Sequence, residues 1–232
     1  MVAVLDPPDV TDLQERLEAD GVASTPPLLT PEQCAETVAM FDDDERFRST
    51  VVMARHAFGE GTYRYFADPL PTLVQQLREE LYPAMAAVAN RWADQLGERR
   101  FPTRLDALLA ECCTLGQHRT TPLLLRYGPG GYNCLHQDVY GDLTFPLQFL
   151  VMLSRPDEDF TGGESVFVEQ RPRQQSRPIV VRPRQGEAIV FPVRHRPQRG
   201  TRGFHRVQMR HGVSAVHSGS RHVLGIIFHN AR

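Results

Sequence analysis

The sequence predicts an α+β protein in which a helical N-terminal half precedes an all-β C-terminal half. Up to about residue 117, apolar residues recur at the three- and four-residue steps of amphipathic helices. After Thr120, short apolar or alternating runs are broken by Gly and Pro, which is typical of a β-sandwich or barrel. A chain of 232 residues can bury one sizeable core. We therefore expect one structural unit, with residues 1–118 as a helical elaboration packed on a β core of residues 119–232.

Helices are expected over residues 12–19, 31–41, 71–96 and 104–115. The second has the clearest start, because Thr30 can cap it, Pro31 suits its first position and Gln33 completes a capping box. The third carries apolar side chains on one face, and Pro83 is a point where it can bend or divide. Residues 56–66 are rich in Gly and Tyr and predict a loop or hairpin, either a packed aromatic loop or a substrate lid.

Eight strands are expected after residue 120, over residues 122–127, 133–139, 147–153, 164–169, 179–182, 188–193, 204–216 and 222–229. The seventh is long enough to be bent or interrupted. Neither an internal repeat nor a low-complexity linker divides this region. The strands are therefore expected to form one core.

The basic residues are distributed unevenly. The chain contains no Lys, so all 26 basic residues are Arg; residues 1–154 carry 12 Arg against 22 acidic groups, and residues 155–232 carry 14 against 6. A guanidinium makes forked contacts with carboxylate or phosphate. The C-terminal third therefore either binds an anionic partner or carries solvated Arg on strand edges. The arginines expected near the mouth of the barrel are Arg171, Arg173, Arg177, Arg194, Arg196, Arg199, Arg202 and Arg206.

Membrane and disulfide-rich classes are not indicated. The four cysteines lack the paired spacing of a zinc site and are expected to be reduced structural thiols. No run of 18 apolar residues occurs, and residues 1–10 lack a basic start followed by an apolar stretch. We expect a cytoplasmic protein that has no membrane partner.

The motif His136-Gln137-Asp138 predicts two metal ligands. It lies inside an expected strand, where side chains two residues apart point to the same face. Two histidines and one carboxylate that leave coordination positions open are diagnostic of non-haem Fe(II) oxygenases. The pair alone is weak evidence, because nine histidines in this chain should yield about one His-x-acid motif by chance. An ordinary His–Asp hydrogen bond is the alternative.

The C-terminal segment supplies the remaining residues. His211 is the expected third ligand, and Arg221 follows it by ten residues, after a Ser-Gly-Ser turn and at the start of the next apolar strand. In a β-barrel the two would lie near each other, and a guanidinium can hold a carboxylate in a two-pronged contact. His205 and His217 are the competing third ligands, but neither has an Arg ten residues on.

Four blocks in this order resemble the Fe(II)/2-oxoglutarate oxygenases of the prolyl-hydroxylase type: residues 125–138, 160–164, 185–191 and 211–221. Residues 136–151, 159–177 and 200–230 are more closely similar to a bacterial family of these oxygenases, described as acting in oxidative repair of alkylated nucleic acid. The ten-residue offset from His211 to Arg221 is the hydroxylase pattern. AlkB-like DNA repair enzymes place the co-substrate Arg further beyond the distal His, and a second Arg follows it.

The resemblance implies a double-stranded β-helix (jelly-roll or cupin-like) core with the N-terminal helices packed on one sheet. It implies His136, Asp138 and His211 as Fe(II) ligands and Arg221 as the salt-bridge partner of the co-substrate 2-oxoglutarate, with O2 as the oxidant. Tyr127 would line the co-substrate pocket, and Gly162-Gly163-Glu164 would form the turn into the next strand.

The expected activity is oxidation of a substrate C–H bond with release of succinate and CO2. The outcome is hydroxylation, or demethylation where the carbon is attached to nitrogen. The substrate is expected to be a small molecule or an amino-acid side chain; the first alternative is an alkylated nucleic acid. The second alternative is a cupin-like metal-binding protein without oxygenase activity. The sequence predicts neither the substrate nor the oligomeric state.

Overall fold

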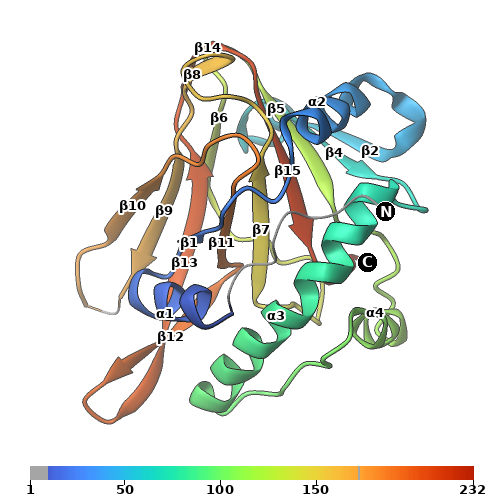
Figure 1. Cartoon of the computed structure of the whole chain (residues 1–232). Helices are drawn as coiled ribbons and strands as arrows, with labels where there is room; N and C mark the ends of the chain where they lie inside the picture. The colour runs from blue at the N-terminus through green and yellow to red at the C-terminus, as the bar shows by residue number, and fades with distance from the viewer. Residues whose placement is uncertain (1–9, 172) are drawn as a thin grey trace.

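The computed structural model describes residues 10–171 and 173–232, so the expectation for the N-terminal ten residues lies almost entirely outside the described chain. Two antiparallel β-sheets form the centre of the molecule (Figure 1). The larger sheet has the order β1 (Ala23–Ser24), β11 (Ala188–Pro192), β7 (Leu147–Met152), β15 (Arg221–Ile227), β5 (Leu123–Tyr127), β4 (Thr62–Phe66) and β2 (Phe47–Val52).

The smaller sheet has the order β10 (Arg177–Val181), β9 (Ser165–Gln170), β13 (Gly203–Val213), β6 (Tyr132–His136) and β3 (Gly59–Glu60), and β12 (His195–Gly200) pairs with β13. A third pair consists of β8 (Phe160–Gly162) and β14 (Val216–Gly219). Every pair of strands is antiparallel. The arrangement confirms the predicted α+β class with a double-stranded β-helix core.

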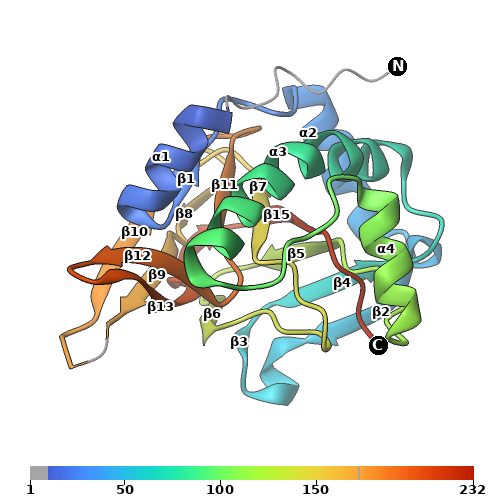
Figure 2. The same ribbon diagram turned by 90° about the horizontal axis from the view of Figure 1, so that it is seen from below.

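The four predicted helices are present as α1 (Val10–Asp20), α2 (Pro31–Ala39), α3 (Thr72–Leu96) and α4 (Leu105–Thr114). The capping box of α2 forms as predicted, with the Gln33 backbone N–H donating to Thr30 Oγ1 at 3.2 Å. Pro83 lies inside α3 without dividing it. Apolar side chains of α3 pack on the larger sheet, and Figure 2 shows α3 and α1 on one side of the molecule. The largest hydrophobic cluster therefore lies between the helices and the larger sheet.

The number of strands was predicted wrongly, because the described residues contain eleven strands after residue 120 instead of eight, and four more before it. The N-terminal half is not only helical, since β2 and β4 pair with each other and extend the larger sheet beyond β5. The strand β12 was not expected, because its sequence HRPQRG has no alternation of apolar and polar residues that would predict a strand. The expected strand 204–216 is divided into β13 and β14, and the strand expected to reach residue 139 ends at His136. The division into residues 1–118 and 119–232 stays a prediction.

Two further expectations concern cysteines and membranes. Cys34, Cys112, Cys113 and Cys134 are all free thiols, as predicted. Within the described parts of the chain, no helix is both long and apolar enough to cross a bilayer.

Candidate functional site

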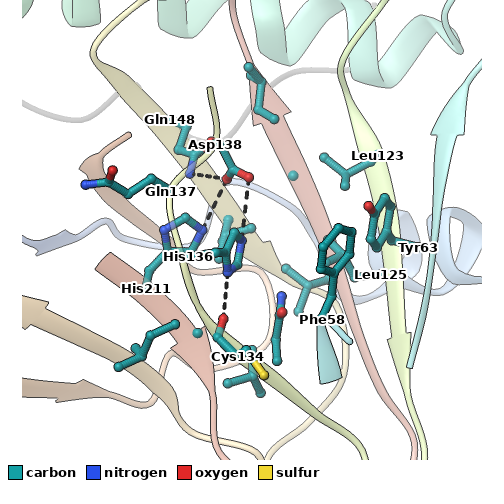
Figure 3. Close-up of a pocket in the computed structure, with 18 of the residues that line it drawn as sticks. Phe58, Tyr63, Leu123, Leu125, Cys134, His136, Gln137, Asp138, Gln148 and His211 are labelled. Atoms are coloured by element: carbon teal, nitrogen blue, oxygen red, sulfur yellow. Dashed lines mark hydrogen bonds and ion pairs between the residues drawn. The ribbon is translucent and has the colours of Figure 1, made fainter. Parts of the chain in front are cut away.

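Three predicted ligand residues converge between the two sheets. His136 ends β6, His211 lies opposite it on β13, and Asp138 follows two residues after β6 (Figure 3). Asp138 Oδ2 is 3.1 Å from His211 Nε2, and Asp138 Oδ1 is 3.5 Å from His136 Nε2. One nitrogen or oxygen atom of each residue lies within 4.8 Å of the others, close enough to share one ion. Two imidazoles and a carboxylate are a donor set that suits Fe(II).

The strand argument for Asp138 was wrong in one respect, because Asp138 lies beyond the end of β6. The residue between the two ligands explains why the carboxylate still faces the histidines. The Gln137 side chain points away from them and donates to the backbone oxygens of Arg194 at 3.0 Å and Met209 at 2.9 Å. These bonds hold the loop against the smaller sheet after the strand pairing has ended.

The ligand residues are oriented by fixed partners. His136 Nδ1 lies 2.8 Å from the Cys134 carbonyl oxygen, and donation to this oxygen leaves the Nε2 lone pair directed at the shared centre. Tyr140 donates its hydroxyl to Asp138 Oδ1 at 2.7 Å, and Gln148 Nε2 donates to Asp138 Oδ2 at 2.8 Å. Both carboxylate oxygens are thus held before any ion binds.

The titration of the three groups reflects their close approach. Burial alone would raise the pKa of Asp138, but the charge of His211 and the hydrogen bond to His136 hold this pKa well below its usual value. Burial would lower the pKa of His136, but its bond to Asp138 raises it. Burial and the charge of His136 lower the pKa of His211. The protein thus favours an ionised Asp138, the form that binds a metal, whereas the raised pKa of His136 means that a proton must leave its ring when a metal binds.

Arg221, the predicted co-substrate anchor, begins β15 and is almost fully buried. Its Nη2 donates to Ser165 Oγ at 3.0 Å, its Nε has no hydrogen-bond partner, and no carboxylate of the described residues forms an ion pair with it. Burial lowers the pKa of Arg221 to about 10. Tyr127 lies opposite Arg221 in the β5–β15 register, with its ring centre 5.5 Å from the guanidinium carbon. Burial raises the pKa of Tyr127 to about 12, so this phenol stays neutral.

One cavity of about 400 Å³ contains the ligand residues, Arg221 and Tyr127 together. The remaining wall is mainly apolar and aromatic, with Phe58, Tyr63 and Tyr65 among its side chains. The 56–66 segment, expected as a loop or hairpin, therefore supplies aromatic side chains to the cavity.

Comparison with known proteins identifies the family. Residues 61–231 match the family Oxygenase-NA, described as an "oxygenase, catalysing oxidative methylation of damaged DNA". The chain belongs to this oxygenase family. It is also 46% identical over 167 residues to two proteins of Mycobacterium tuberculosis, MT2286 of strain CDC 1551 and Rv2227 of strain H37Rv. The match covers 72% of this chain and 72% of each relative.

Solved structures show where the fold of this Oxygenase-NA member recurs. A prolyl-4-hydroxylase of Pseudomonas putida has a TM-score of 0.54 at 16% identity, with 97% of this chain and 100% of that chain covered. A prolyl hydroxylase of Trichoplax adhaerens, solved with a hypoxia-inducible-factor peptide, has a TM-score of 0.58 at 13% identity, with 95% and 89% covered. The family match makes the protein an oxygenase, and these structures share its fold.

The structure also shows which candidates lie elsewhere. His205 and His217, the competing ligands, are exposed and do not line the cavity. Sequence reasoning missed Tyr140, Gln148 and Ser165, which contact the site residues. Gln148 carried a usable signal, since it is the one polar residue in the run 147–153 of an expected buried strand.

The predicted turn at Gly162 and Gly163 is present, and both residues have positive φ, of 70° and 62°. A Cβ atom on Gly163 would lie 3.0 Å from Cδ of Arg221 and 2.8 Å from a methyl group of Val216. Glycine at this position therefore leaves room for the Arg221 side chain.

Proposed function

We propose that the protein binds Fe(II) through His136, Asp138 and His211, anchors 2-oxoglutarate through Arg221, and oxidises a C–H bond of a substrate in the 400 Å³ cavity. One observation carries the proposal. The buried guanidinium of Arg221 has no carboxylate partner among the described residues and lines the same cavity as the three ligands. An unpaired buried charge is costly, so its presence indicates an anion that binds there.

The site residues fit the two proposed groups. Bound Fe(II) and 2-oxoglutarate supply activation of O2, coupled to decarboxylation of 2-oxoglutarate to succinate and CO2. Arg221 would pair with the far carboxylate of 2-oxoglutarate, whose charge it matches, while Ser165 holds the guanidinium in place. Tyr127 would cover one side of the co-substrate. The apolar cavity wall excludes water from the reacting atoms.

The cavity favours an uncharged group as the site of oxidation. Apart from the three ligand residues and Arg221, its lining contains no ionisable side chains other than tyrosines and Cys134. A small molecule or an amino-acid side chain with an apolar carbon fits such a wall. The product would be an alcohol, or a demethylated amine where the oxidised carbon is attached to nitrogen.

An alkylated nucleic acid is the second candidate substrate, because the family description refers to damaged DNA. The aromatic side chains of the cavity wall would stack on a base turned out of its strand. A cytoplasmic location belongs to the same proposal, since four unbridged cysteines and a ferrous ion both suit a reducing compartment.

The test measures succinate release from 2-oxoglutarate with Fe(II), with and without candidate substrates. We expect release in the wild type and none in His136→Ala, which loses a ligand. Arg221→Met should raise the KM for 2-oxoglutarate by about 100-fold or more while metal binding persists, because a two-pronged charged contact is lost. Arg104→Ala, at an exposed ion pair, is the control. Unchanged succinate release in His136→Ala would refute the ligand assignment, and no release by the wild type would favour a cupin-like binding protein.

A further inference from the structure

We propose that the outer face of β13, together with the β12–β13 hairpin, binds the phosphodiester backbone of a nucleic-acid strand and guides it to the metal site. This inference rests on the proposed function with an alkylated nucleic acid as substrate, and it names the surface that would bind that nucleic acid. The hairpin projects from the body of the protein (Figures 1 and 2). It pairs fully from His195↔Gln208 to Gly200↔Gly203, whereas β9 pairs with β13 only from Gln208 onward. Residues 203–207 therefore pair only with β12.

The outward side chains of β13 form a line that ends beside a ligand. Arg206, Gln208 and Arg210 alternate with the buried Val207, Met209 and His211. Side chains on one face of a strand repeat about every 7 Å, so the two arginines stand about 14 Å apart. Arg210 directly precedes His211, and Arg206 lies toward the hairpin tip. Positive charge thus runs along the outer face of β13, up to the residue next to His211 in the chain.

Arginines without a carboxylate partner gather on this surface, although they also occur elsewhere. Some exposed arginines outside it, such as Arg104 and Arg155, pair with neighbouring carboxylates, and others, such as Arg55 and Arg119, form no ion pair with any described residue. On the hairpin and next to it, four exposed arginines make no ion pair with any described residue: Arg194, Arg199, Arg202 and Arg210. Arg196, by contrast, is buried and paired with Glu169, so it does not belong to this surface. Exposed guanidinium groups without carboxylate partners are suited to phosphates.

A hollow of about 700 Å³ lies against this face. Arg171, Arg194, Arg206 and His195 line it with two glutamines, and Glu98 is its only carboxylate among the described residues. Glu98 already accepts from Arg206 at 2.6 Å. The backbone oxygen of Arg194 accepts from Gln137, which also lines the metal cavity. Gln137, on the loop that carries Asp138, therefore lines the metal cavity and also contacts a residue that lines the hollow.

An aromatic side chain accompanies the charges. Phe204 is 40% exposed and lies opposite Arg199 in the hairpin register, two residues from Arg206. An exposed aromatic ring between cations can stack on a base while the guanidinium groups hold the backbone. Arginines that only keep an edge strand from pairing with other chains would not need this ring.

The test measures binding of fluorescein-labelled single-stranded and duplex DNA to the full-length chain by anisotropy over a series of salt concentrations. The variant is Arg199→Ala/Arg202→Ala/Arg210→Ala. The control removes the same charge from paired arginines, Arg104→Ala/Arg155→Ala/Arg232→Ala. We expect the hairpin variant to bind about tenfold more weakly or worse, and its slope of log affinity against log salt to fall by about 2 on single strands. The control should bind like the wild type.

Three results would overturn the proposal: salt-independent or absent binding by the wild type, equal loss in the control, or hairpin variants that self-associate but bind DNA normally. Displacement of DNA by polyglutamate at equal charge concentration would indicate an acidic protein partner instead and would also refute it. DNA binding needs no iron, so each of these results leaves succinate release as a separate test of the oxygenase. Cobalt binding by the hairpin variant checks that its metal site is intact.

Discussion

Asp138 shows how single residues prepare this site for a metal. A carboxylate at the end of an unpaired loop would have many orientations, yet Tyr140 and Gln148 hold one oxygen each. The entropy cost of ordering the ligand is thus met when the protein folds. Burial and the nearby Asp138 charge raise the pKa of Tyr140 well above its usual value, so its hydroxyl keeps the proton that it donates.

Removing either partner should weaken metal binding without removing a ligand. We expect Tyr140→Phe and Gln148→Leu each to lower the affinity for Fe(II) about 10- to 100-fold, which is the usual effect of losing a hydrogen bond to a ligand. Anaerobic calorimetric titration with Fe(II) measures this. Tyr132→Phe, at an exposed tyrosine, is the control. Unchanged affinity in both variants would show that the loop orients Asp138 unaided.

His229 predicts a dependence of stability on pH that is separate from the ligands. It is fully buried, Nδ1 accepts from the Phe145 N–H at 3.2 Å, and burial lowers its pKa from 6.5 to about 4. Between about pH 6.5 and pH 4, His229 is therefore protonated in the unfolded chain but neutral in the folded chain. Stability should fall as the pH drops from about 6.5 to about 4, by up to about 3 kcal/mol.

Denaturant unfolding of the wild type and of His229→Asn across this pH range measures the effect. Asn can still accept from Phe145 but does not titrate, so the variant should lose less stability on acidification. If the free energy of unfolding fell equally with pH in the two proteins, burial would not lower the pKa of His229.

At the scale of elements, sequence patterns predicted helices better than strands. The α2 start was predictable because its cap is local, with the bonded partners three residues apart. The end of β6 was not predictable, because the hydrogen bonds that redirect the chain after His136 join Gln137 to Arg194 and Met209. These two residues lie 57 and 72 positions further along the chain. Periodicity therefore selected His136 and Asp138 as candidate ligands that the structure brings together, although the strand that was expected to align them stops short of Asp138.

The turn between β8 and β9 offers a test of how an element shapes the co-substrate pocket. Gly163→Ala should raise the KM for 2-oxoglutarate at least severalfold, because the added methyl group would press on Arg221. Gly97→Ala is a matched control, since Gly97 has nearly the same φ, 64°, and nothing within 4 Å of the added atom. Both variants carry the backbone strain of a left-handed non-glycine residue, about 1 kcal/mol or more. If both variants raised the KM equally, strain and not the contact with Arg221 would be the cause.

At the scale of the molecule, the site depends on both sheets. His136 and His211 lie on the smaller sheet, and Arg221 and Tyr127 lie on the larger one. Motif spacing and the family resemblance selected all four residues, because the blocks that carry them are short and contiguous. The structure places them around one cavity, and their roles stay a prediction. The aromatic wall supplied by β4 and the projecting hairpin of β12 were not predicted as such, since each depends on pairing between distant segments.

In the proposed arrangement 2-oxoglutarate would link the two sheets, which predicts ordered stabilisation by ligands. Without O2, a divalent metal should raise the melting temperature of the wild type, and 2-oxoglutarate should raise it further only after the metal is bound. Each ligand at 100 times its Kd adds about 2.7 kcal/mol. Arg221→Met should keep the metal increment and lose that of 2-oxoglutarate, and its unliganded form should melt no lower than the wild type, because an unpaired buried charge has been removed. His136→Ala should lose both increments. A co-substrate increment that survived in Arg221→Met would mean that 2-oxoglutarate binds away from β15 and that the two sheets are not joined through it.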